Sequence, residues 1–208
     1  MNIVPARHAA RDVYRLMTAM IVPRPIAFVS SLSSGGARNL APFSFFTAVS
    51  ANPPVVCFAP MRRGADGSMK DTLVNIEETR EFVVNIVSEE IAGKMNACSE
   101  EVPPEVDEFI LSGLTPVPSA VVAPPRVGES RASMECRLLQ VVHVSPLPLG
   151  GSLVLGEVLL FHVQDDLFDN FSLDPALLRA FGRMGGSTYA RTTDRFEMPR
   201  PPRREKRV

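Results

Sequence analysis

The chain has 208 residues and a formal net charge of −1 at pH 7, with 45% hydrophobic and 22% charged residues. This composition is ordinary for a globular protein and too polar for a membrane protein, and the small net charge argues against nucleic acid as the main partner. No apolar run approaches the roughly 20 residues needed to cross a bilayer. The N-terminal segment also lacks an apolar signal core, so we expect a cytoplasmic protein with no membrane span.

The length predicts one domain, which we place at residues 1–198, followed by a basic tail at residues 199–208. The tail holds five basic residues and one acidic residue, so it is either a solvated, disordered end or a contact for an anionic surface. Cys57, Cys98 and Cys136 are odd in number and far apart, which predicts reduced thiols rather than a disulfide framework.

The first predicted elements are one helix and three strands. Residues 7–20 carry apolar side chains at helical spacing, and Pro23 stops this helix. Residues 25–33 and 39–50 indicate antiparallel strands around the turn SGGAR, and residues 53–60 form a third strand bracketed by prolines.

The middle of the chain mixes helices with one strand. Ser68 and Asp71 have the capping-box spacing, which predicts a helix that begins near Met69. The expected elements after it are a strand at residues 81–87 and helical patches at residues 89–97 and 105–111, the last ended by Gly113.

A proline-rich crossing at residues 116–125 is interpreted as extended surface chain within the same domain. The long strands beyond it, residues 133–144 and 153–163, pair with each other and must join the earlier sheet, because two strands alone cannot bury a core. Six or seven strands with helices inserted between them predict a mainly β fold, an antiparallel barrel with helical insertions.

Several common catalytic motifs are absent. The sequence has no Gly-x-Ser-x-Gly elbow, no Cys-x-x-Cys or His-Glu-x-x-His spacing, and no Gly-x-Gly-x-x-Gly fingerprint. His143 and His162 lie on predicted strands that pair, so they are either structural or two ligands that meet across the hairpin. With no third ligand in sight, we expect no metal site.

The loop GADGSMKDT, residues 64–72, is the one local feature that indicates a ligand. A glycine-containing loop that ends at a helix N-terminus presents backbone amides to an anion, and Lys70 with the hydroxyls of Ser68 and Thr72 would complete a phosphate site. A capped helix with a solvated lysine explains the same residues.

Two longer stretches together resemble a known family. VPRPIAFVSSLSSGGARNLAPFSFFTAVSANPPVVCF and KDTLVNIEETREFVVNIV are similar to the flavin reductase-like family of FMN-binding split-barrel proteins, which includes flavoredoxins and the reductase partners of two-component monooxygenases. The resemblance is dense from Tyr14 to Val87 and continues thinly through GEVLLFHV to RMGGSTY.

The resemblance implies an antiparallel Greek-key split β-barrel that binds FMN without a covalent bond, usually as a homodimer with the flavin close to the subunit interface. It implies that Lys70, Asp71 and Thr72 hold the phosphate, and it puts Arg183 and Tyr189 near the flavin. The residues implied to border the flavin ring are Ser30, Ser31, Ala41, Pro42, Ser44 and Phe46.

Physical chemistry adds detail to these implied roles. Because Pro42 has no N–H, the strand around it leaves backbone groups unpaired, and a flavin edge needs such partners. Phe45 and Phe46 are adjacent on a predicted strand, so we expect one to serve the core and the other the cofactor or a dimer contact. We expect Asp71 to cap the helix or orient Lys70, and Arg24 to reach phosphate or a partner subunit.

The function implied is an oxidoreductase in which FMN takes hydride from NADH or NADPH and passes electrons to free flavin, oxygen or a protein partner such as a monooxygenase. Hydride transfer itself needs no acid or base, so no catalytic side chain is named. The alternatives are an FMN-binding electron carrier of the flavoredoxin type without its own nicotinamide site, and a flavin-free binding module that keeps the barrel.

Overall fold

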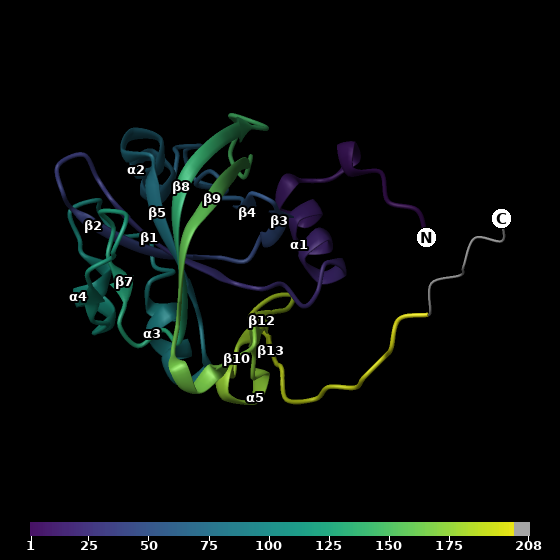
Figure 1. The fold of residues 1–208 in the computed structure, drawn as a ribbon. Helices are drawn as coiled ribbons and strands as arrows, with labels where there is room; N and C mark the ends of the chain where they lie inside the picture. Colours follow the sequence, from purple (N-terminus) through teal and green to yellow (C-terminus); the bar gives the residue numbers. More distant parts are fainter. Residues whose placement is uncertain (202–208) are drawn as a thin grey trace, which may run out of the picture.

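The computed structural model describes residues 1–201, and its main feature is a seven-stranded antiparallel sheet with the order β2-β1-β5-β8-β9-β4-β3 (Figure 1). The mainly β, antiparallel fold predicted from the sequence is therefore confirmed. The predicted basic tail spans residues 199–208, of which residues 202–208 lie outside the described residues. The strands are β1 (Ala27–Leu32), β2 (Arg38–Phe43), β3 (Phe46–Ala51), β4 (Pro54–Phe58), β5 (Glu81–Ile86), β8 (Ala132–His143) and β9 (Ser152–Val163).

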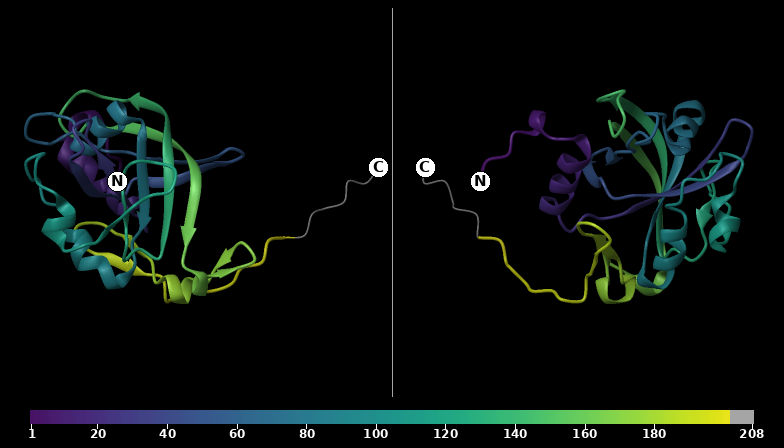
Figure 2. Two further views of the ribbon diagram at one scale, coloured as in Figure 1. Left: turned by 60° about the vertical axis from the view of Figure 1, so that its left-hand side comes forward. Right: turned by 180° about the vertical axis from the view of Figure 1, so that it is seen from behind.

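The sheet closes on itself at one short segment. Its two edge strands, β2 and β3, are consecutive in the chain and are joined only by Ser44 and Phe45. Both edges can lie two residues apart only if the sheet curls into a barrel, and the views in Figure 2 show this curl. The sequence predicted a single strand over residues 39–50, and this is wrong, because the structure has two strands there. The chain pairs with β1 through β2 and with β4 through β3. At the junction between them, Ala59 N donates to Phe45 O at 2.8 Å.

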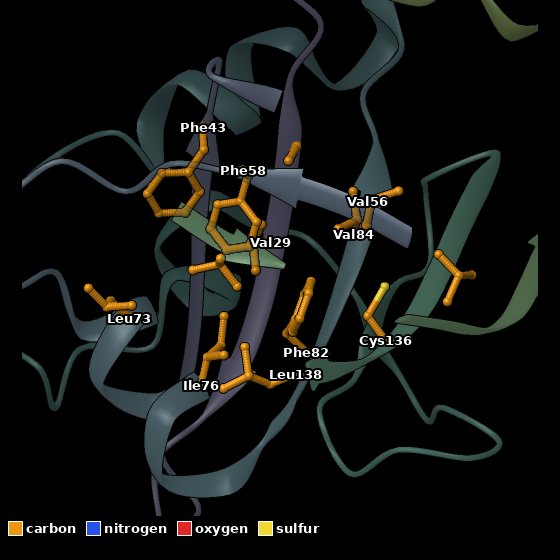
Figure 3. Close-up of a cluster of buried hydrophobic side chains, with 13 residues drawn as sticks. Val29, Phe43, Val56, Phe58, Leu73, Ile76, Phe82, Val84, Cys136 and Leu138 are labelled. Atoms are coloured by element: carbon orange, nitrogen blue, oxygen red, sulfur yellow. The ribbon is translucent and has the colours of Figure 1, made fainter. Parts of the chain in front are cut away.

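The barrel interior is filled by one apolar cluster contributed by alternate residues of the strands and by α2 (Asp71–Thr79) (Figure 3). Phe43, Phe58 and Phe82 pack with ring centroids 5.1 and 5.6 Å apart. Gly156 on β9 makes room for this stack, since a Cβ there would overlap Cζ of Phe82. Burial of these three aromatic rings contributes strongly to hydrophobic stability.

A second apolar cluster lies on the other face of β1 and packs the helices α3 (Ala92–Ala97) and α4 (Glu108–Ser112) against the barrel. Ile26 and Phe28 belong to it, whereas Ala27 and Val29 face the barrel interior. Gly113 ends α4 with a φ of +65°, which confirms its predicted position after the last turn. The α-helices are α1 (Ala10–Met20), α2 (Asp71–Thr79), α3 (Ala92–Ala97), α4 (Glu108–Ser112) and α5 (Pro175–Leu178).

Three two-stranded ribbons and three 3-10 turns complete the structure. The predicted patch at residues 89–97 divides into a 3-10 turn and α3. Among the helices of residues 1–201, none combines the length and apolar character that crossing a bilayer requires. The ribbons are β6 (Pro116–Val117) with β7 (Arg126–Val127), β10 (Phe168–Asp169) with β11 (Ser172–Leu173), and β12 (Phe181–Arg183) with β13 (Tyr189–Arg191), and the 3-10 turns are Pro5–Arg7, Glu89–Ile91 and Asp165–Leu167.

The proline-rich crossing is fastened to the barrel by a buried carboxylate. Glu135 on β8 accepts hydrogen bonds from the backbone N–H groups of Ala120, Val121 and Val122 at 2.7–3.2 Å, and His162 contacts the same carboxylate at 2.5 Å. His143 instead contacts Ser152 and Glu77 at the opposite end of the β8–β9 pair. The two histidines therefore do not meet, and each has a structural partner.

Candidate functional site

A cavity of about 230 Å³, which we call the main cavity, opens where the barrel closes. One wall is the end of β2 and the Ser44–Phe45 junction, a second is the N-terminus of α2, and a third is the loop after α3. Tyr14 of α1 completes the lining and contacts Phe45, with ring centroids 6.2 Å apart. Segments far apart in the sequence thus meet at the one place where the sheet changes edge.

The α2 end of the cavity carries two cations and two unpaired backbone donors. Asp71 and Thr72 occupy the first turn, and their N–H groups have no protein acceptor within residues 1–201. Lys70 precedes them, and its Nζ lies 2.8 Å from Oε1 of Glu101. Arg63 donates to Asp71 Oδ2 at 2.8 Å. This is the cation and amide set that binds phosphate at helix N-termini.

The predicted roles of the residues before α2 need correction. The helix begins at Asp71 rather than near Met69, and the Ser68 hydroxyl donates to Asp66 instead of closing a capping box. Asp71 neither caps the helix nor orients Lys70, because its carboxylate pairs with Arg63. The hydrogen bond from Lys70 lowers the pKa of the Glu101 carboxyl, so Glu101 is ionised at neutral pH.

A buried polar network lies beneath the same wall. Glu108 is 5% exposed and accepts from Asn39 Nδ2 at 2.8 Å and from the Leu40 N–H at 3.0 Å. Burial raises the pKa of the Glu108 carboxyl, against the effect of these bonds. Thr72 donates its hydroxyl proton to Asn39 Oδ1 at 2.6 Å, which leaves only lone pairs of that hydroxyl for a ligand. Burial also raises the pKa of the nearby Cys98 thiol to about 11, so it stays protonated.

The β2 edge supplies the cavity with backbone groups of both kinds. The Leu40 N–H points away from β1 toward Glu108, so the next outward position on this edge is Pro42, which has a carbonyl but no N–H. The N–H groups of Ser44 and Phe45 have no acceptor among the described residues. An edge with a bare carbonyl and two bare amides fits a flavin ring, whose rim has several acceptors and one donor.

The structure brings some of the predicted site residues to this cavity and leaves others away from it. Ala41, Pro42, Ser44, Lys70, Asp71 and Thr72 line it. Ser30 and Ser31 are fully buried, and their hydroxyls donate to Pro125 O and Asn39 Oδ1 within the protein. Phe46 packs against the barrel core, and Phe45 takes the cavity wall instead.

Arg183 and Tyr189 line a neighbouring cavity of about 260 Å³, which we call the second lobe. The second lobe shares Tyr14, Pro42, Ser44 and Ser99 with the main cavity, so the two spaces adjoin. Arg24 does not reach outward as predicted. It is 4% exposed and ties three parts of the chain together, with bonds to the carbonyls of Thr18, Ile21 and Met184 and to the Ser44 hydroxyl.

Sequence reasoning missed Tyr14, Arg63, Glu101 and Glu108, which all line the main cavity. Arg63 had a weak signal, since a pair of arginines precedes the glycine-containing loop. Glu101 and Glu108 had none, because their partners Lys70 and Asn39 lie 31 and 69 residues away in the chain.

Comparison with known proteins identifies the family of this chain. Residues 18–187 match the model of the flavin reductase like domain. The chain is 43% identical over 180 residues to an uncharacterized protein of Aquifex aeolicus, covering 86% of this chain and 89% of that one.

Two solved structures are similar over nearly the whole chain. Nitrilotriacetate monooxygenase component B from Bacillus cereus has a TM-score of 0.90 and 34% identity, covering 95% of this chain and 98% of that one. Pseudomonas fluorescens 2-nitrobenzoate 2-nitroreductase NbaA has a TM-score of 0.86 and 32% identity, with full coverage of both chains. The split-barrel fold is thereby confirmed, and the chain belongs to the flavin reductase-like family.

Proposed function

We propose that this protein is an FMN-dependent oxidoreductase that takes hydride from NADH or NADPH and passes electrons to free flavin, oxygen or a protein partner. The observation that carries the proposal is the main cavity, in which the bare backbone groups of the β2 edge face the same space as the cationic N-terminus of α2. FMN has both a flat ring with a polar rim and a phosphate, so these two walls suit its two parts.

The phosphate would be held by Lys70, Arg63 and the N–H groups of Asp71 and Thr72. The segment Ala41–Phe45 would hold the ring, with the Ser44 and Phe45 amides as donors. FMN, when bound, supplies the capacity to accept a hydride and to release electrons singly or in pairs. The protein orients the cofactor and shields one side of it, so no side chain is assigned an acid or base role.

The two similar solved structures support the reaction class. One is named as component B of a monooxygenase and the other as a nitroreductase, and both names describe redox proteins. We propose that this chain likewise has a redox protein as its partner and delivers electrons to it.

A homodimer and a cytoplasmic location complete the proposal. Helix α1 and the residue after it expose an apolar face, with Met17, Met20 and Ile21 at 45%, 74% and 53% exposure (Figure 1). A second copy that covered this face would also close the cavity wall at Tyr14. The three cysteines are buried free thiols, as a reducing compartment favours. Sedimentation velocity would test the dimer.

An anaerobic absorption spectrum of the FMN-loaded protein, before and after NADH and then NADPH, tests the function. Immediate bleaching of the flavin bands supports the reductase and identifies the donor. Flavin bands that persist would refute the nicotinamide step and favour the electron carrier, and a failure to bind FMN would refute the whole proposal.

A further inference from the structure

Arg183 lines the second lobe and has no carboxylate partner in residues 1–201, and the buried Arg24 beside it, which does not itself line the lobe, has none there either. Arg24 and Arg183 are directly opposite each other on adjacent extended segments, since Arg24 N donates to Arg183 O at 2.9 Å and Arg183 N donates to Arg24 O at 2.8 Å. Their guanidinium groups bond only to backbone carbonyls and one serine hydroxyl. Burial lowers the pKa of Arg24, and the nearby charge of Arg183 lowers it further.

The cations of the main cavity, unlike Arg183 of the second lobe, have carboxylate partners. There, Lys70 pairs with Glu101 and Arg63 pairs with Asp71, so each cation has an anion at 2.8 Å. Like charges placed opposite each other on paired strands destabilise a protein unless something else compensates them. The positive charge of the second lobe therefore points to an anionic ligand that the folded chain does not itself supply.

The donors of the second lobe suit an anion with many oxygens. Arg183 uses only Nη2 in a protein hydrogen bond, to Gly186 O at 2.6 Å, and its Cζ lies over the Tyr189 ring, 4.5 Å from the centroid. The Ser44 hydroxyl accepts from Arg24 Nε at 3.3 Å and keeps its own proton for a ligand. Tyr14 adds a phenol on the shared wall. Several donors around about 260 Å³ match a diphosphate better than a single carboxylate.

The position of the second lobe indicates which diphosphate would bind there. It adjoins the Ala41–Phe45 wall, where the proposed function puts the flavin ring, and its lining does not include Lys70 or the first turn of α2. A donor whose nicotinamide lay beside the flavin would carry its pyrophosphate a short way from that ring. We propose that the second lobe binds the pyrophosphate of the nicotinamide dinucleotide, with Arg183 as its main anchor. This inference rests on the proposed function, and it assigns Arg183 to the donor rather than to FMN.

The test uses ADP-ribose, which keeps the pyrophosphate and lacks the nicotinamide. Its binding to the FMN-loaded protein is measured by calorimetry for the wild type, Arg183→Gln and the control Arg191→Gln. Arg191 is a suitable control because it lies on the same ribbon, pairs with Glu89 at 2.9 Å and lines neither cavity. We expect Arg183→Gln to weaken ADP-ribose binding about tenfold or more, with FMN affinity unchanged and no effect of Arg191→Gln.

Three results would overturn the inference: wild-type protein that does not bind ADP-ribose, an Arg183→Gln variant that binds it normally, or an Arg183→Gln variant that loses FMN. The bleaching experiment reports separately on the proposed function. Protein that binds ADP-ribose through Arg183 but is not bleached by NADH or NADPH would refute the reductase and leave the pyrophosphate site standing.

Discussion

The ion pair between Lys70 and Glu101 predicts that Glu101 competes with the phosphate of the ligand, so Glu101→Gln should tighten FMN binding. The Nζ···Oε1 distance is 2.8 Å, and the two side chains are 31% and 53% exposed. Ion pairs at this exposure are worth about 0.2–1 kcal/mol. Removing the competitor should therefore strengthen FMN binding about 1.4- to 5-fold. Glutamine keeps the size of the side chain, so only its charge changes.

The assay is a fluorescence titration of FMN, and separately of riboflavin, into the apoprotein. Riboflavin lacks the phosphate, so its affinity should not change in Glu101→Gln. Glu100→Gln is the matched control, because Glu100 lines the same cavity but forms no ion pair among the described residues. The gain should shrink as salt is added. An unchanged FMN affinity, or an equal gain for riboflavin, would show that Glu101 does not compete for Lys70.

Three further predictions concern the same wall and the core behind it. Lys70→Ala should weaken FMN binding by about 1–2 kcal/mol, because a charged hydrogen bond to the phosphate is lost while the Lys70–Glu101 ion pair no longer has to be broken. Titration should show that the affinity for riboflavin is unaffected. Gly156→Ala should lower the free energy of unfolding by about 1–3 kcal/mol, because the new Cβ overlaps the buried Phe82 ring. Gly151→Ala, where no atom lies within 4 Å, should change it by less than about 0.5 kcal/mol in the same urea titrations. Burial raises the pKa of Glu108 above 4.5, so its contribution to stability is full below the unfolded-state pKa and is lost as pH rises through the folded-state pKa. The wild type should accordingly lose stability relative to Glu108→Gln as pH rises above about 4.5 in urea titrations, and a pH-independent difference would contradict this assignment.

Local patterns carried much of the fold. Apolar periodicity located α1, and the proline brackets located β4, because these signals depend on neighbours in the chain. Gly113 could be placed at a helix end because a left-handed residue after the last turn strongly favours glycine. The capping box failed for a physical reason, since Ser68 found a closer acceptor in Asp66, two residues away.

Long-range pairs set the limit of what sequence alone predicts. The partner of Lys70 is Glu101, and Glu108 binds β2 from 68 residues away, so neither pairing follows from spacing. Phe45 and Phe46 show a finer limit. Alternation along a strand predicted that one would face the core and one the ligand, but which residue does which depends on where the strand breaks.

The break at Ser44 and Phe45 explains why the segment before it mixes the features of a strand with those of a loop. A strand that belongs to one edge of a sheet up to Phe43 and to the opposite edge from Phe46 must leave two residues outside both ladders. The amides of those two residues are the donors that the cavity presents. Arg24 holds the junction by donating a hydrogen bond to the Ser44 hydroxyl. The two residues that close the barrel therefore also form the wall that faces the ligand. Loss of the Arg24 guanidinium should therefore disturb flavin binding and stability together, although Arg24 lines neither cavity.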